Sequence, residues 1–248
     1  MRYSSIVKIY ERPNLNDPVL IEGLPGIGLV ANIVVAFLIK KLNVKIFCEI
    51  RSPHFHDMAI TVEGSFISYP VNQLYYYKGT SGERDLILLY GNTQALTSRG
   101  QYELCGRILD IAKSLGCKYV ITLGGYRPGR TVTKPKIYFA ASDEDMAKIA
   151  KELKAQPLEI SIFGVAGLLI GLCKLLGMKG LCLLAETPGT YPDKEAASEL
   201  LKALSNILKL KIDLGEIGDP RDLISVLSPF DFGALARRRE RARPVWFV

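Results

Sequence analysis

Several loops of this chain combine glycine with carboxylate or hydroxyl side chains, which are groups that bind anions or transfer protons. One is Glu22-Gly-Leu-Pro-Gly-Ile-Gly28, which joins a short apolar run to a long apolar stretch. Glycines such as Gly26 and Gly28 let backbone amides face an anion at the start of a helix. The spacing differs from the dinucleotide fingerprint, and no Gly-Lys-Ser/Thr run marks a P-loop. A tight crossover that needs positive φ is the alternative interpretation.

A second candidate loop is Glu186-Thr-Pro-Gly-Thr-Tyr-Pro-Asp193, which follows an apolar run typical of a central strand. Open α/β sheets bind ligands at the carboxyl ends of their strands. This loop could therefore meet Gly91-Asn-Thr-Gln94 and Gly124-Gly-Tyr-Arg-Pro-Gly-Arg130 at one edge. Glu186 could act as an acid or base and Thr187 could bind a ligand, or the threonine and the closing aspartate could start turns and cap helices. With no histidine, cysteine or Ser–His–acid set, these loops predict no catalytic residue.

The chain's two histidines, His54 and His56, stand next to Asp57 in a His-Phe-His-Asp run. Two imidazoles two residues apart share one face of a strand and could hold a metal ion. The spacing marks no third ligand, so a solvent-facing loop is the favoured interpretation. We therefore expect no metal and no cofactor.

The composition of the 248 residues, 48% hydrophobic and 23% charged, is typical of a folded domain. No apolar run reaches the roughly 18 residues of a membrane span, and the N-terminus lacks the pattern of a signal peptide. We therefore expect a cytoplasmic protein with no membrane partner. The five cysteines form no Cys-x-x-Cys pair and stand among apolar residues, which predicts buried thiols in a reducing compartment.

Regular apolar patterns predict the secondary structure that positions the loops. Strands are predicted at 18–22, 44–50, 85–90, 118–123 and 180–185, and helices at 28–41, 99–115, 164–176, 193–208 and 222–227. The alternation within 61–69 predicts an antiparallel hairpin that turns at Glu63-Gly64. Gly124-Gly125 is expected to end one strand, and Tyr75-Tyr76-Tyr77 could form an edge strand with an exposed aromatic face.

Strand–loop–helix units with continuously apolar strands predict an α/β fold with three layers. We expect a mostly parallel sheet with an antiparallel β excursion. Residues 1–218 are predicted to form this α/β domain, and residues 219–248 a short helix followed by a basic tail with a hydrophobic end.

In their order along the chain, these motifs resemble the PAC2-like proteasome assembly chaperones, especially the archaeal members. The motifs that carry the resemblance are Glu22–Gly28, Glu63-Gly64, Tyr69–Asn72, Gly91–Gln94, Gly124-Gly125, Val165–Leu169 and Leu184–Gly189, with Asp193 and Ala196-Ala197. The resemblance implies a fold like that of the purine nucleoside phosphorylases, used as a non-catalytic binding scaffold in homo-oligomers. Kinship of fold does not confer enzymatic activity.

The chain ends in Pro244-Val-Trp-Phe-Val248. Archaeal chaperones of this family and proteasome activators can end in a hydrophobic–tyrosine–any-residue (HbYX) motif, which inserts between neighbouring α subunits of the proteasome ring. By this resemblance Trp246 takes the hydrophobic place, Phe247 the tyrosine place and Val248 the last place. Phenylalanine departs from the motif because it lacks the phenolic hydroxyl. The alternative is that this end packs on its own core or seals a subunit interface.

The net charge of +7 is concentrated just before this end, because residues 237–243 hold five arginines and one glutamate. Arg241 and Arg243 are therefore candidates for contact with a partner. A basic tail could also bind nucleic acid, but no nucleic-acid-binding module is visible. The sequence favours a proteasome assembly chaperone or ring-binding protein. The alternatives are a nucleoside-phosphorylase-like enzyme that binds a small molecule, and a nucleic-acid-binding protein.

Overall fold

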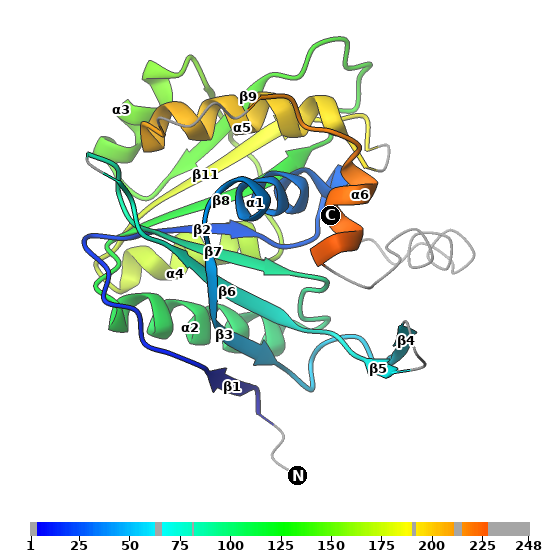
Figure 1. Ribbon diagram of the computed structural model, residues 1–248. Coiled ribbons are helices and arrows are strands. Elements are labelled where there is room, and N and C mark those ends of the chain that lie inside the picture. The colour runs from blue at the N-terminus through cyan, green and yellow to red at the C-terminus, as the bar shows by residue number, and fades with distance from the viewer. Residues whose placement is uncertain (1–3, 63–65, 81, 190–191, 211–214, 228–248) are drawn as a thin grey trace.

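The computed structural model describes residues 4–62, 66–80, 82–189, 192–210 and 215–227 (Figure 1). Nine strands form one sheet in the order β1-β3-β6-β7-β2-β8-β11-β9-β10. They are β1 Ile6–Ile9, β2 Val19–Gly23, β3 Lys45–Arg51, β6 Asn72–Tyr77, β7 Leu86–Gly91, β8 Tyr119–Tyr126, β9 Ile137–Ala141, β10 Gln156–Pro157 and β11 Lys179–Glu186. The helices are η1 Ile27–Leu29, α1 Val30–Lys41, α2 Ser98–Ser114, α3 Glu144–Glu152, α4 Val165–Leu175, α5 Lys194–Leu208 and α6 Pro220–Leu227. The predicted α/β class is confirmed.

The sheet is evenly mixed, so the expectation of a mostly parallel sheet was wrong. The strands β7, β2, β8 and β11 run parallel at the centre. On one side β1, β3, β6 and β7 pair antiparallel, and on the other β9 pairs antiparallel with β11. The reason is local, because the connection from β6 to β7 is short and contains no helix. Parallel neighbours need a long crossover between them.

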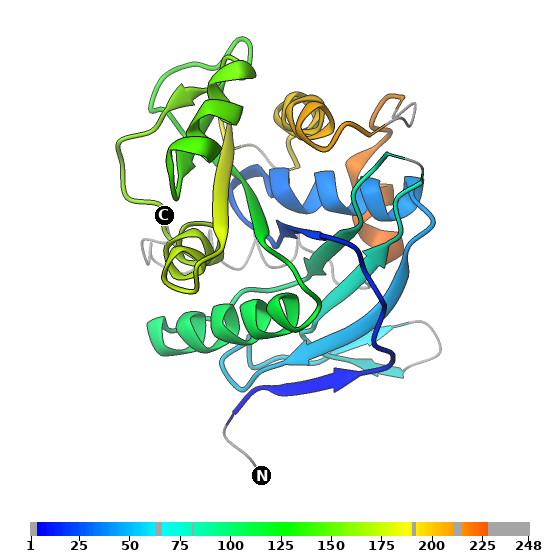
Figure 2. The ribbon, with the colours of Figure 1, turned by 90° about the vertical axis from the view of Figure 1, so that its left-hand side faces the viewer.

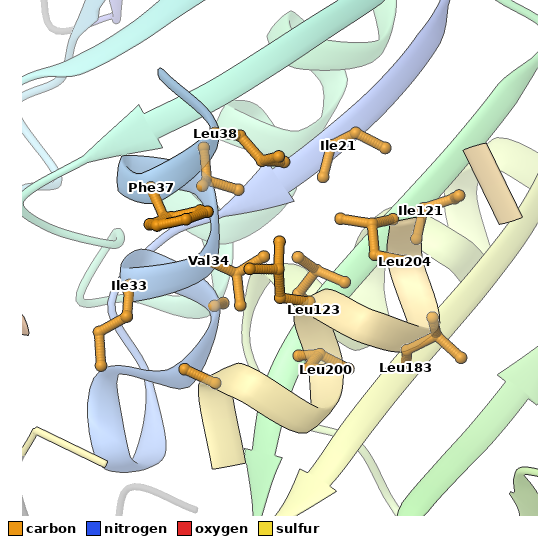
Figure 3. Packing of buried hydrophobic residues seen from close by; sticks show 14 of the residues in the cluster. Ile21, Ile33, Val34, Phe37, Leu38, Ile121, Leu123, Leu183, Leu200 and Leu204 are labelled. Atoms are coloured by element: carbon orange, nitrogen blue, oxygen red, sulfur yellow. The ribbon is translucent and has the colours of Figure 1, made fainter. Parts of the chain in front are cut away.

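Two cores lie on opposite faces of this sheet (Figure 2). Side chains alternate along the strands, so Ile21 of β2 faces the core under α1 and α5, whereas Leu20 faces the core under α2 and α4. Figure 3 shows Val34 of α1 and Leu200 of α5 packed together on the first face. The second core contains all five cysteines: Cys48, Cys105, Cys117, Cys173 and Cys182. All five are buried free thiols, as predicted.

Strand β8 continues through Gly124 and Gly125, where the sequence predicted that it would stop. The two glycines pair with Leu184 and Ala185 of β11. A Cβ atom on Gly125 would lie 2.4 Å from the carbonyl oxygen of Ile27. Glycine is therefore required here by the close approach of the loop after β2, and not by a turn.

The region between β3 and β6 contains the predicted antiparallel hairpin, formed by β4 (Ile60–Val62) and β5 (Phe66–Ser68). Its predicted turn at Glu63-Gly64 lies outside the described residues. Figure 1 shows this hairpin projecting from the body on the same side as α6. The tyrosine run Tyr75–Tyr77 lies in β6, which is an internal strand between β3 and β7, so the edge-strand interpretation was wrong.

Helix α6 packs against α1, and its Leu223 and Ile224 belong to the core on that face. Within the described residues, no helix is both long enough and apolar enough to cross a membrane.

Candidate functional site

The central parallel strands end at one edge of the sheet, where the loops after β2 and β11 contact each other and the end of β8. Gly28 lies in the first loop, Thr187 in the second, and Gly125 near the end of β8. The predicted ligand candidates Gly28 and Thr187 are thus brought together, as expected from the rule that carboxyl ends of parallel strands share an edge. Whether a ligand binds to them stays a prediction.

The loop after β2 turns through two residues with left-handed backbone, Gly28 with φ of 64° and Leu29 with φ of 54°. A Cβ atom on Gly28 would lie 2.9 Å from Thr187 Oγ1, so both conformation and space require glycine. Gly26 differs, because a Cβ there would meet no atom within 4 Å and its backbone is extended. Of the two predicted glycines, Gly28 therefore forms the crossover, whereas Gly26 lies at an open position.

Thr187 and Asp193 bind each other and hold the loop after β11 against the loop after β2. Thr187 Oγ1 donates a hydrogen bond to Asp193 Oδ2, and the backbone N–H of Asp193 donates to the Gly28 carbonyl at 2.9 Å. The other carboxylate oxygen of Asp193 accepts from the Ala196 N–H at 3.0 Å and so caps α5. The predicted capping role of Asp193 is confirmed, and these groups serve the packing of the loops.

Glu186 is the last residue of β11. It is 0% exposed, and both of its carboxylate oxygens have hydrogen-bond partners. One carboxylate oxygen lies 2.5 Å from a guanidinium nitrogen of Arg130 and accepts from the Tyr138 hydroxyl at 2.9 Å. The other accepts from the Lys136 N–H at 3.4 Å. Glu186 therefore anchors the exposed basic loop of residues 127–136 to the end of the sheet. From the sequence, Glu186 was a candidate acid or base, and its pairing with Arg130 was not predicted.

Two amide side chains, the half-buried Gln94 and the buried Asn32, tie further loops to this edge. Gln94, in the loop after β7, donates to the Pro25 carbonyl at 2.7 Å and accepts from the Val165 N–H at 3.0 Å. It therefore connects the loop after β2 to the start of α4. Asn32 of α1 donates to the carbonyls of Gly23 and Gly91 at 3.1 and 2.9 Å. Asn32 was not among the residues predicted to matter, although a single amide within an otherwise apolar helix indicates a buried hydrogen-bond role.

Glu22 lies at the end of β2 with 1% of its surface exposed. Its Oε1 accepts from the Leu24 N–H at 2.7 Å, and its Oε2 has no hydrogen-bond partner among the described residues. Burial raises the pKa of this carboxyl group to about 8, although the backbone amides of Leu24 and Leu123 oppose the shift. Glu22 therefore carries a proton at neutral pH and is shielded from solvent.

His54 and His56 lie in the turn that follows β3 and not on a strand, so the geometry that suggested a metal pair is absent. His54 Nε2 lies 3.3 Å from a carboxylate oxygen of Glu103. His56 Nδ1 lies 2.9 Å from the Thr93 hydroxyl. The described part of the chain contains no cluster of three or more histidine, cysteine, aspartate or glutamate residues that could hold a metal ion.

The predicted partner-binding residues Arg241, Arg243, Trp246, Phe247 and Val248 lie outside the described residues. Helix α6 is the last element before them. This helix packs against α1, on the side of the molecule that carries the β4–β5 hairpin (Figure 1).

Together, the fold and this edge define an α/β scaffold whose strand-end loops are bound to one another. The PAC2 family model matches residues 20–219, and the chain belongs to the PAC2 family. A curated relative, an uncharacterized protein of Methanocaldococcus jannaschii, is 31% identical over 212 residues, which are 85% of this chain and 81% of the relative.

Two solved structures extend this likeness. PbaB of Pyrococcus furiosus, described as an archaeal proteasome activator, is 33% identical with a TM-score of 0.81, and the match covers 96% of this chain and all of PbaB. PbaA of Pyrococcus furiosus is described as an archaeal homolog of proteasome-assembly chaperone. It is 25% identical with a TM-score of 0.71, over 96% of this chain and 94% of PbaA.

Proposed function

We propose that this chain is a non-catalytic proteasome-binding protein of the activator or assembly-chaperone type. In this proposal it works as a homo-oligomer and docks its C-terminal end between α subunits of the proteasome ring. The observation that carries the proposal is the likeness to PbaB, an archaeal proteasome activator, over nearly the full length of both chains.

The chemistry of the loops supports a scaffold more than an active site. Glu186, Thr187 and Asp193 direct their polar atoms to partners within the chain. The carboxyl group of Glu22 is buried and neutral at physiological pH. A general acid or base has to reach its substrate, and these groups instead stabilise the fold.

The chemistry of the C-terminal end supports docking as a peptide. Trp246 and Phe247 offer large apolar side chains, and the carboxylate of Val248 can pair with a lysine in a partner pocket. Arg241 and Arg243 add positive charge that can contact an acidic rim of the same pocket. Phe247 keeps the aromatic ring of the motif and lacks only the hydroxyl.

The test is direct binding of the full chain to recombinant rings of proteasome α subunits. We expect intact protein to bind, a version lacking Trp246–Val248 to lose binding, and Phe247→Ala to bind at least tenfold more weakly. Phe247→Tyr should bind at least as tightly as the natural sequence, because it restores the motif's hydroxyl. The matched control is Asn206→Ala on the exposed surface of α5.

Two results would count against the docking mechanism or the function. Equal binding by the intact and truncated versions would place recognition in the folded body. Absence of binding by the intact protein to rings that bind a known activator would reject the proposed function.

A further inference from the structure

Helix α4 is apolar apart from Lys174, yet its second half has exposed residues on one side, namely Gly171, Lys174 and Leu175. Such helices are normally buried on all sides. Helix α1 is also apolar and is buried throughout Val30–Ile39, because α5 and α6 pack against sides of it that the sheet does not cover. Helix α4 packs mainly against β8, β11 and α2 (Figure 2). It therefore lacks the cover that a second and third helix give to α1.

The apolar residues on the outward side of α4 and just before it form a stripe that we name the α4 outer face: Phe163, Leu168, Gly171, Leu172 and Leu175. Phe163 is 61% and Leu175 80% exposed, whereas Leu168 and Leu172 are half-buried and also pack against the α2–α4 core. The spacing from Leu168 to Leu175 follows the period of one helix side. Ile160 and Leu176 extend the exposed apolar surface beyond the two ends of the helix, at 50% and 40% exposure. Contiguous exposed apolar surface of this kind marks interaction sites.

Other helices of the chain present charge to solvent. The exposed residues of α2 include Arg99, Arg107, Asp110 and Lys113, those of α3 include Glu144, Asp145, Lys148 and Lys151, and those of α5 include Lys194, Glu195 and Lys202. On α4 the single charged residue is Lys174. A surface that buries the α4 outer face has to be similarly apolar. Among the described helices the one that offers such a surface is α4 itself.

We infer that the α4 outer face packs antiparallel against the same face of a second copy of this chain, related by a two-fold axis. Charge at the two ends of the helix complements this arrangement. Glu159 precedes α4 and Lys174 lies in its last turn, and both are exposed. Neither has an ion-pair partner among the described residues. Antiparallel packing brings Lys174 of each copy to Glu159 of the other. The two-fold contact therefore forms this ion pair twice, once at each end.

The consequence for activity rests on the proposed function, whereas the contact itself does not. Pairing through α4 joins two bodies, each with its own C-terminal end. Two or more ends on one assembly raise the apparent affinity for a ring with repeated pockets through effective concentration. The test below therefore uses the full chain without any proteasome, so that its result is independent of ring binding.

The first experiment measures the mass of the assembly by sedimentation at micromolar protein. We expect the natural chain to be a dimer or larger. Leu175→Glu should weaken the association at least 100-fold, because it buries a charge within an apolar contact. Leu175 is 80% exposed, so the folded chain should tolerate this change, and circular dichroism checks that it does. The matched control Asn206→Glu on α5 should keep the natural mass. A monomeric natural chain, or an unchanged mass for Leu175→Glu, would overturn the inference.

The second experiment tests the two-fold geometry with a single exposed thiol. A Cβ atom on Gly171 meets no atom within 4 Å, and the native cysteines are buried. We expect Gly171→Cys to cross-link to a second copy with a short bis-maleimide, and Asn206→Cys to remain uncross-linked. Loss of mass in Leu175→Glu without cross-linking of Gly171→Cys would overturn the antiparallel α4 pairing and indicate contact between unlike surfaces.

Discussion

A buried carboxyl group has to be neutral or paired, and Glu22 is the described residue in which this constraint is clearest. One of its oxygens binds the Leu24 N–H and the other has no partner among the described residues. Its neutral form keeps the end of β2 in an apolar layer beside α2 and α4. The folded protein therefore binds a proton that the unfolded chain releases at a much lower pH.

The first prediction concerns the pH dependence of stability. The pKa of Glu22 is about 8 in the folded protein and near its ordinary value of 4.5 when unfolded. Between these values the folded state holds more protons, so this group makes the free energy of unfolding fall as pH rises from about 4.5 to 8. Glu22→Gln keeps the acceptor for Leu24 and cannot ionise. It should raise stability at pH 7 by on the order of 3 kcal/mol and flatten the decline.

Urea denaturation at pH 5, 6.5 and 8 measures this effect. The control is Glu152→Gln, since Glu152 is exposed on α3. An identical pH dependence for Glu22→Gln and the natural chain would show that Glu22 is ionised in the folded state.

At the scale of elements, the basic loop of residues 127–136 is held by one buried carboxylate. The pair is asymmetric, because Glu186 is fully buried whereas the side chain of Arg130 is 49% exposed. Removing the arginine leaves a buried charge without its ion-pair partner. Removing the glutamate charge leaves an arginine that water can still solvate.

The second prediction follows from this asymmetry. Arg130→Ala should destabilise the protein by about 2 kcal/mol, whereas Glu186→Gln should cost less than about 1 kcal/mol because it keeps an acceptor for Tyr138. Urea denaturation at pH 7 measures both. Lys202→Ala, which removes an exposed pair with Glu199, should change stability by less than about 0.5 kcal/mol. Equal losses for Arg130→Ala and Glu186→Gln would contradict this account of the loop.

Apolar periodicity was sufficient to predict most of these elements. It located β2, β3, β7, β11 and the helices α1, α2, α4 and α5 to within a residue or two. The spacing of apolar residues in these elements directly reflects which of their side chains are buried. It did not give the direction of β6 or the continuation of β8 through Gly124 and Gly125. Both depend on which segments become neighbours, and that is decided by tertiary contacts. The meeting of the loops was predictable from strand direction, whereas the pairing of Glu186 with Arg130 was not.

At the scale of the molecule, the two sides of the sheet differ in how completely they are closed. On one side α5 and α6 both pack against α1 and complete its burial, whereas on the other side α2 is the described helix that packs against α4 and part of α4 stays exposed. The inferred pairing of α4 would cover that exposed part and set the number of C-terminal ends presented together. Assembly through α4 would then raise the apparent affinity for the proteasome ring.

The third prediction tests this coupling. Leu175→Glu keeps its C-terminal end intact, yet we expect it to bind α-subunit rings at least tenfold more weakly than the natural chain, because single ends lose the gain from effective concentration. Surface plasmon resonance on immobilised rings measures the difference, with Asn206→Glu as the control. Equal affinity would mean that one end is sufficient for docking, even if the protein is an oligomer in solution.

All five thiols lie in the α2–α4 core, so a thiol reagent can detect opening of that core and cannot detect opening of the core under α1. Burial raises the pKa of Cys48, Cys117 and Cys173 to about 11, so little thiolate forms while this core is closed. The rate of alkylation by a thiol reagent therefore measures how often the core under α4 opens. If two chains pair through α4 as inferred, the native cysteines should be alkylated more slowly in the natural chain than in Leu175→Glu. The ratio of the two rates would measure how much the pairing stabilises the core under α4.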